Sequence, residues 1–464
     1  MIGCLRYGTG FEALRERDDH VRSHDRPSKC PERGCFYAEA GFANERTLNQ
    51  HTTQCHTDPA SNRFVFPNFR KSPPAMDERN KFREAIRRED LDLLRDMIHT
   101  NGSLRGQLSP GSYTGLGYAA FHGKLKSIRC LLECGCNIGA VSDRGTALHA
   151  ACNSRQAGVV QFLLSNSTSE DLKRKNKEGR TPLANAVRKG YEEAVRLILK
   201  HGVGADVNAK DNTGRTALSW AASSLVWGRA LIKTLLEQDG VDVDVKDAEG
   251  RTPLSWAASE GDPESVRLFL ECGEEVDVNS KDNKGRTPLS WAASRTRGLE
   301  SPSAVKLLLE QDRVDVDAKD DDGRTPLSWA ASESFLEVVR LFLEYGEEVD
   351  VNSKDNKGRT PLSWAASWWT RGLASSPVVQ VLLEQDKVDV DTKDDDGRTP
   401  LSWAASEGQA GTVRLFLRHG LGVAVNSKDK GDRTPLSWAL AREDSQKEQV
   451  VKILVQNGGI TGVL

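Results

Sequence analysis

Apolar residues recur along most of the chain in short groups at helical spacing, and polar stretches separate the groups. Residues 250–273 show the pattern, with Leu254 and Ala258 in one group and Val266 and Phe269 in the next. Side chains three or four residues apart lie on the same side of a helix, so each group predicts a short helix with one buried side. The stretch therefore predicts two helices joined by a turn.

The residues between the apolar groups indicate where each helix begins and ends. Thr252 is a residue type that caps helix N-termini, and Pro253 suits the first helical turn because its missing N–H needs no partner there. Gly261 is expected to end the first helix, and Gly273 suits a left-handed cap after the second. The VDVNSKD stretch that follows leads into a turn at 282–285 and predicts an extended hairpin.

This whole pattern repeats along the chain. The phrase GRTPLSWAA, or a close variant, places one threonine in each unit at intervals of 35 to 39 residues: Thr181, Thr216, Thr252, Thr287, Thr325, Thr360, Thr399 and Thr434. Degenerate copies occur at Thr114 and Thr146, and an apolar-periodic stretch from Asp77 to Thr100 fits a partial unit that caps the N-terminal end. A fixed period of this length predicts an all-α solenoid of about eleven units.

The turn, the two helices and the Thr-Pro-Leu opening together resemble the ankyrin repeat. The resemblance covers roughly residues 78–464 and implies that hairpin tips and first helices line one concave surface on which protein partners dock. In the unit that begins at Thr252 the resemblance implies these outward positions: Ala248, Glu249, Arg251, Ser259 and Glu260. At the tips Asn-Lys alternates with Asp-Asp, and this mixed charge suits a protein partner better than a phosphate backbone.

One position departs from the family in most units. Serine follows Thr-Pro-Leu where the family has histidine, and only the early unit keeps an imidazole, at His149. In the family this histidine ties adjacent loops together, so the shorter serine hydroxyl brings that hydrogen bond into question. We expect the tryptophan after each serine to fill the core of the stack, and the arginine before each threonine to pair with nearby aspartates.

Two units carry additional residues between their helices, RTRGLESPS after Thr287 and WWTRGLASS after Thr360. Insertions of this kind lie in loops outside the stack. The adjacent Trp368 and Trp369 are therefore candidate contact residues for a partner.

Composition excludes several classes of protein. The chain has 64 basic and 67 acidic residues and a net charge of −3, so it lacks the overall positive field that holds nucleic acid or an anionic membrane. It has neither a stretch of about eighteen apolar residues nor a signal-peptide core, so we expect an intracellular protein of the nucleus or cytoplasm with no membrane partner. No phosphate-binding loop, nucleophile elbow or paired acid–base motif occurs, which predicts that the protein is not an enzyme.

The N-terminal segment has the spacing of a zinc site. Residues 30–56 contain Cys-x4-Cys followed by His-x4-His, and a tetrahedral Zn²⁺ site of two thiolates and two imidazoles would supply the folding energy that so short a segment lacks. The pattern resembles the ββα finger with two Cys and two His ligands. Cys55 remains an alternative to His56. The predicted metal ligands are Cys30, Cys35, His51 and His56.

Together these patterns predict four segments and a leading function. The segments are a degenerate finger-like segment at 1–27, a zinc finger at 28–58, a linker at 59–77 and the repeat array at 78–464. The architecture resembles fungal ankyrin-repeat proteins that carry similar fingers. We predict a protein–protein interaction scaffold, with the zinc-stabilised finger as an accessory module.

The alternative is a DNA-binding transcriptional regulator that uses the finger. Its helix would present Asn44, Thr47 and Gln50 to bases. One finger covers only about three base pairs, and residues 1–60 have no excess of basic side chains. Nucleic acid is therefore a possible partner that the sequence does not favour.

Overall fold

The computed structural model describes residues 74–106, 108, 111–201, 204–272, 275–294, 302–345, 348–367, 376–418, 422–443 and 446–462. By its internal contacts the chain divides into two units, Met1–Ala75 and Met76–Leu464. The four predicted zinc ligands lie outside the described residues, and so do Trp368 and Trp369.

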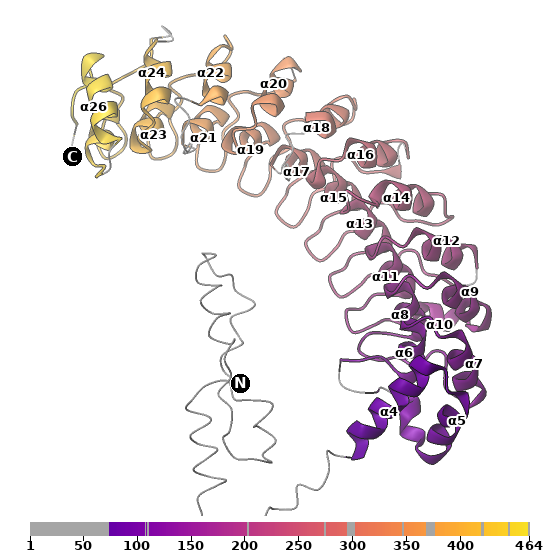
Figure 1. Ribbon diagram of the computed structural model, residues 1–464. Coiled ribbons are helices and arrows are strands. Elements are labelled where there is room, and N and C mark those ends of the chain that lie inside the picture. Colours follow the sequence, from indigo (N-terminus) through magenta and orange to yellow (C-terminus); the bar gives the residue numbers. More distant parts are fainter. Residues whose placement is uncertain are drawn as a thin grey trace, which may run out of the picture. The chain divides into compact units, whose positions relative to one another are not determined.

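Pairs of short helices follow one another through the described part of the array (Figure 1). The N-terminal pair is α4 (Pro74–Arg88) and α5 (Leu91–Thr100), followed by the short 3-10 helix η2 (Gly102–Arg105). The first helices of the later units are α6 (Gly115–Phe121), α8 (Ala147–Asn153), α11 (Pro182–Arg188), α13 (Ala217–Ala222), α15 (Pro253–Glu260), α17 (Pro288–Ser294), α19 (Pro326–Ser332), α21 (Pro361–Ser367), α23 (Pro400–Ser406) and α25 (Pro435–Leu440). The second helices are α7 (Leu125–Glu133), α9 (Ala157–Asn166), α12 (Glu192–Lys200), α14 (Gly228–Leu236), α16 (Pro263–Leu270), α18 (Pro302–Leu309), α20 (Leu336–Glu344), α22 (Pro377–Leu383), α24 (Ala410–Arg418) and α26 (Lys447–Gln456).

This order confirms the prediction of an all-α array of about eleven units. One further helix, α10 (Ser169–Lys173), lies between two units. Among the described residues the β-type pairing is limited to an isolated bridge between Ser142 and Gly145, so the hairpins are turns stacked side by side. Helix α4 begins at Pro74, within the segment predicted as a linker.

The helix boundaries arise from the local chemistry that the sequence predicts. Thr252 Oγ1 accepts a hydrogen bond from the Ser255 N–H at 3.2 Å, and Pro253 occupies the first turn of α15. Gly261 ends this helix with a φ of 72°, a left-handed conformation that glycine adopts without strain. Threonine caps with a following proline recur at α11, α19, α23 and α25.

The core runs through the array as one continuous cluster, because the first helices from α6 to α25 pack on one another in succession, as do the second helices from α9 to α26. Leu254, Ala257, Ala258, Val266 and Phe269 are all fully buried in the repeat that contains α15 and α16. The alanine pair has little bulk, so neighbouring first helices approach closely. Figure 1 shows the first helices and the hairpins on the inner side of the row, with the second helices outside.

Hydrogen bonds between units also link the hairpins. The Asn283 N–H donates to the Glu249 carbonyl at 2.9 Å, and the Asp321 N–H donates to the Lys284 carbonyl at 3.0 Å. Lys246 Nζ donates to the carbonyl of Lys281, its counterpart in the next hairpin, at 2.8 Å. Both patterns recur along the array, so the hairpin tips form a row held at a fixed spacing.

The replacement of histidine by serine changes one of these links. His149 Nε2 contacts the Arg180 carbonyl of the next unit at 2.8 Å, as the family resemblance implies. In the serine units the hydroxyl contacts its own cap instead, with Ser255 Oγ 3.1 Å from Thr252 Oγ1. The lysine and tip hydrogen bonds therefore connect the hairpins where the imidazole is missing.

Candidate protein-docking surface

The hairpin tips are the most accessible part of the inner side. Two successive residues are exposed at each tip from Lys177 onward, and they alternate in charge towards the C-terminal end: Asn283 and Lys284, Asp321 and Asp322, Asn356 and Lys357, Asp395 and Asp396. In the unit of Thr252 the tip residues Ala248 and Glu249 are exposed, as predicted.

The other outward positions predicted for that unit are wrong. Arg251, Ser259 and Glu260 are buried, with side chains 4%, 2% and 8% exposed. Arg251 Nη2 donates to Ser259 Oγ at 2.6 Å, and Ser259 Oγ donates to the Trp256 carbonyl at 2.9 Å. Arg251 lies over the indoles of Trp256 and Trp291 instead of pointing outward, so the family analogy fails there.

Below each tip, one aspartate joins the hairpin to the first helix. Asp247 Oδ1 accepts hydrogen bonds from the N–H groups of Glu249 and Arg251, which closes the turn, and Asp247 Oδ2 accepts one from Trp256 Nε1 at 2.8 Å. The same aspartate–tryptophan bond occurs at Asp211–Trp220, Asp282–Trp291, Asp320–Trp329, Asp355–Trp364, Asp394–Trp403 and Asp429–Trp438.

The arginines and tryptophans of successive units stack alternately along the first helices. The Arg251 guanidinium carbon lies 3.5 Å from the Trp256 ring centre and 3.8 Å from that of Trp291 in the next unit. We call this stack the arginine–tryptophan ladder. Its members are Arg215, Trp220, Arg251, Trp256, Arg286, Trp291, Arg324, Trp329, Arg359, Trp364, Arg398, Trp403, Arg433 and Trp438.

The ladder corrects two expectations. Trp291 is buried, but the other ladder indoles are only half-buried. Trp220, Trp256 and Trp403 pack against the edge of the core, and guanidinium groups stack on their faces. Ion pairing with aspartate occurs at Arg286–Asp282, at 3.4 Å, and at Arg433–Asp429, at 3.3 Å. Elsewhere the guanidinium group bonds to helix carbonyls and serine hydroxyls. The signal that sequence analysis missed is that Arg and Trp recur together in every unit from that of Thr216 to that of Thr434.

Burial between two rings affects the charge of the ladder arginines. It lowers the pKa of Arg215, Arg324 and Arg398 to about 10, although nearby carboxylates act in the opposite direction. These groups stay protonated near neutral pH. The ladder is therefore a row of desolvated cations held over indole faces, where the attraction between cation and ring is strongest.

The unit that begins at Thr181 lies at the N-terminal end of the ladder and lacks several of its parts. Asn176 occupies the place of the aspartate, Asn185 that of the tryptophan and Arg188 that of the serine. Asn185 Nδ2 donates to the His149 carbonyl and to Asn153 Oδ1 in the preceding unit. Arg180 consequently has no indole in its own unit.

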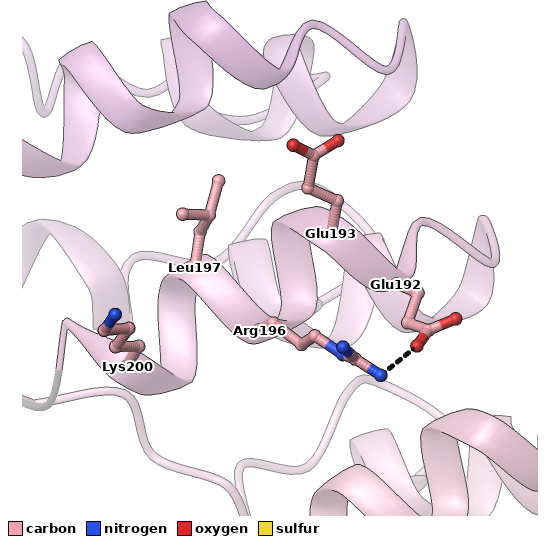
Figure 2. Close-up of a pocket in the computed structure, with 5 residues that line it drawn as sticks. All are labelled: Glu192, Glu193, Arg196, Leu197 and Lys200. Carbon is pink, nitrogen blue, oxygen red and sulfur yellow. Dashed lines mark hydrogen bonds and ion pairs between the residues drawn. The ribbon is translucent and has the colours of Figure 1, made fainter.

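Open depressions lie on the described outer helices α12, α14, α18 and α20. One of about 410 Å³ is lined by residues of α12. In Figure 2 Glu192 and Arg196 form an ion pair of 2.5 Å, whereas Glu193 and Leu197 point away from this pair and Lys200 lies at the other end of the helix. We see no acid–base or nucleophilic arrangement at this depression.

An exposed apolar group lies in the connection between α13 and α14, and sequence analysis did not find it. Leu225 and Val226 are 47% and 84% exposed, and Trp227 is 36% exposed. The Trp227 ring lies against Gly190 of the preceding unit. The sequence does carry a signal for this group, because SSLVWG stands here where the unit of Thr252 has the polar SEGD.

Metal ligands and membrane spans were also sought in the described residues. Within them, no group of three or more His, Cys, Asp or Glu side chains is arranged to hold a metal ion. Likewise, none of the described helices is long and apolar enough to cross a bilayer. The described cysteines Cys130, Cys134, Cys136, Cys152 and Cys272 are free thiols.

Stacked helix pairs with hairpins on one side define the class of helical repeat solenoids. The family model for ankyrin repeats (3 copies) matches residues 82–176, 167–247, 228–320, 296–394 and 370–462. The chain therefore belongs to the ankyrin-repeat family, whose repeats are typically non-enzymatic interaction domains.

Curated relatives match over part of the array. Neurogenic locus notch homolog protein 1 of Mus musculus is 36% identical over 133 residues, which is 28% of this chain and 5% of the relative. Neurogenic locus notch homolog protein 2 of Homo sapiens is 32% identical over 133 residues, again 28% of this chain and 5% of the relative. Neurogenic locus notch homolog protein 1 of Danio rerio is 34% identical over 146 residues, 31% of this chain and 6% of the relative. The matched segment thus spans a small fraction of these relatives.

Proposed function

We propose that this protein is an interaction scaffold that binds other proteins on the inner side of its array, through the hairpin tips and the first helices. The observation that carries the proposal is the row of exposed tip pairs of alternating charge, held at a fixed spacing by backbone and lysine hydrogen bonds between units. Complementary charges on a partner would fix its register along this row.

Rigidity supports this function. Binding costs conformational entropy when the surface must first become ordered, and a pre-organised surface avoids much of that cost. Below the tips, the bonds from Asp247 to the turn and to Trp256 fix each hairpin on its first helix. The arginine–tryptophan ladder then couples each unit to the next.

Affinity capture with the full chain tests the proposal. The variant Asp321→Lys with Asp322→Lys reverses the charge of one exposed tip, and we expect it to lose proteins that the wild type captures. The matched control, Glu337→Lys with Glu344→Lys, makes the same charge change on exposed positions of the outer helix α20. Loss of the same proteins in the control but not in the tip variant would contradict binding on the inner side.

We also propose that residues 28–58 form an accessory zinc finger. The support is the ligand spacing of Cys30, Cys35, His51 and His56, which suits tetrahedral Zn²⁺. Metal analysis of the purified full chain should give one zinc per molecule, and Cys30→Ser should abolish it without changing the melting of the array. Full zinc content in Cys30→Ser would refute this ligand set. Comparing Cys55→Ser with His56→Ala identifies the fourth ligand.

A second candidate is DNA recognition by this finger, in a transcriptional regulator. It is favoured by Asn44, Thr47 and Gln50, whose amide and hydroxyl groups could bond base edges from the predicted finger helix. Selection from random duplexes at physiological salt tests it. Recovery of a consensus site that Asn44→Ala abolishes would support DNA recognition, and recovery of unselected sequences would reject it.

A further inference from the structure

The unit that begins at Thr181 replaces three features of the ladder units together. Relative to its threonine, Asn176 stands where the aspartate belongs, Asn185 where the tryptophan belongs and Arg188 where the serine belongs. The next unit has the regular residues Asp211, Trp220 and Ser223. Two of the three replacements raise the local positive charge, because one removes a carboxylate and another adds a guanidinium group.

The cations of this unit repel one another. Burial lowers the pKa of Arg188 and the positive charge of Arg180 lowers it further, while the negative charge of Glu178 raises it. Burial together with Arg188 and Arg180 lowers the pKa of Lys189 in the same way. In a regular unit the neighbouring groups are acidic. Burial lowers the pKa of Arg215, but the negative charges of Asp247 and Asp211 raise it. The regular unit thus has its own counter-charges, and the unit of Thr181 is short of them.

Few acceptors are available to these three cations. Arg180 Nη2 lies 3.3 Å from Glu178 Oε2, which is half exposed at the hairpin tip. Arg188 and Lys189 have no hydrogen-bond acceptor or ion-pair partner for their side chains among the described residues, and Arg188 Nε is buried. In regular units the serine at the position of Arg188 accepts a hydrogen bond from the ladder arginine, as Ser259 does from Arg251. Arg188 is therefore a half-buried cation with no direct partner among the described residues, although the charge of Glu178 favours its protonated form.

We propose that Arg180, Arg188 and Lys189 form a binding site for the carboxylates of an acidic segment in a protein partner. The site deepens the scaffold function proposed above and rests on it. A guanidinium group presents paired N–H donors that match a carboxylate. With Glu178 counted, the site has a surplus of positive charge that an acidic segment would neutralise.

Charge on the neighbouring tips favours an acidic peptide over nucleic acid. A phosphate backbone that followed the inner side would meet the exposed carboxylates of Glu249, Asp321 and Asp322 within a few units. A short acidic segment needs to occupy only the unit of Thr181. Half-buried Trp220, whose ring centre is 5.9 Å from the Arg180 guanidinium carbon, offers an adjacent contact for an apolar residue of the same segment.

The test measures binding of a fluorescent glutamate-rich peptide that contains one leucine to the full chain, with a matched glutamine-rich peptide and single-stranded DNA for comparison. We expect Arg188→Ser to weaken binding of the glutamate peptide by about tenfold or more. Serine fits this position, because four ladder units that contain Thr252, Thr325, Thr360 and Thr399 hold a serine there that accepts from arginine. The control Arg340→Ser, on the exposed side of α20, should leave the affinity unchanged.

A second measurement separates a binding role from a structural one. Because Arg188→Ser removes a repelled cation, we expect the variant without peptide to unfold at a higher temperature than the wild type. A lower unfolding temperature with unchanged peptide affinity would show that Arg188 is structural and would overturn the proposal. Equal affinity for the glutamine peptide, or tighter binding of DNA at physiological salt, would also overturn it. If Arg188→Ser still captures every partner that the tip variant loses, the scaffold function stands and this site fails.

Discussion

One hairpin position holds asparagine in some units and aspartate in others, and the two side chains contact the next unit differently. In one unit Asn279 Nδ2 donates to the Arg313 carbonyl at 2.7 Å, and Asn279 Oδ1 accepts from the Asp315 N–H at 2.9 Å. The next unit has Asp317 at this position. Its Oδ2 accepts from the Asp350 N–H at 2.7 Å, but its Oδ1 is buried without a hydrogen-bond partner. A carboxylate cannot donate, so the second bond is missing, and burial raises the pKa of Asp317.

We expect Asp317→Asn to stabilise the array at neutral pH by about 1 kcal/mol, because the amide restores the missing donor. The raised pKa means that the fold favours the protonated form of Asp317. The contribution of Asp317 to stability is therefore greatest at low pH and declines as the pH rises through its pKa. The advantage of asparagine should disappear in acid, where the protonated carboxyl can donate. Urea unfolding of both proteins across this pH range measures it.

The reverse substitution is the control. Asn279→Asp removes a donor that is in use, so it should lower the free energy of unfolding at neutral pH and do so less in acid. Asp244 and Asp391 hold the same position in other units, also with a buried, unpartnered oxygen and a raised pKa. A stabilisation by Asp317→Asn that does not depend on pH would contradict the account.

At the scale of the helix and hairpin, the sequence predicts those features that residues within one unit determine. The start of α15 at Pro253 and its end at Gly261 follow from residues within the same unit, and both predictions are confirmed. The ladder could not be predicted in this way, because Arg251 finds its second partner, Trp291, in the following unit. The exposure of the tip residue Glu249 is predicted correctly. The prediction that Arg251 is exposed is wrong, because its burial depends on Trp291 of the next unit.

Stacking and hydrogen bonding by the ladder arginines should depend on the planar guanidinium group. Arg324 lies 3.6 Å and 4.0 Å from the ring centres of Trp329 and Trp364, and its Nη2 donates to the Ser328 carbonyl at 3.2 Å. Lysine keeps the charge but not these contacts. We expect Arg324→Lys to lower the free energy of unfolding by about 2 kcal/mol.

The matched control for this change is Arg340→Lys. Arg340 lies on the exposed side of α20, where its Nε is 3.7 Å from Glu337, and its side chain is about half exposed. Surface pairs of this kind contribute little, so the control should unfold like the wild type. Equal effects of the two substitutions in urea unfolding would show that the ladder adds no stability beyond its charge.

At the scale of the whole array, stability is a sum of contacts between neighbouring units. The first helix α19 packs on α17 before it and α21 after it, and the second helices from α9 to α26 likewise pack on their neighbours. Among the described helices, the main contacts are with the same unit or an adjacent one. Disruption at one position should therefore separate the array into two parts, each of which keeps its own contacts.

This dependence on neighbours predicts that the same substitution has different consequences in the middle of the array and at its end. Leu327 in α19 is fully buried and Leu436 in α25 is 4% exposed, so replacing either by alanine should cost about 3 kcal/mol locally. We expect Leu327→Ala to give two unfolding transitions, because it weakens the link between two long segments. Leu436→Ala should raise hydrogen exchange only in the last units. Uniform exchange along the array in both variants would mean that it unfolds as a single cooperative body.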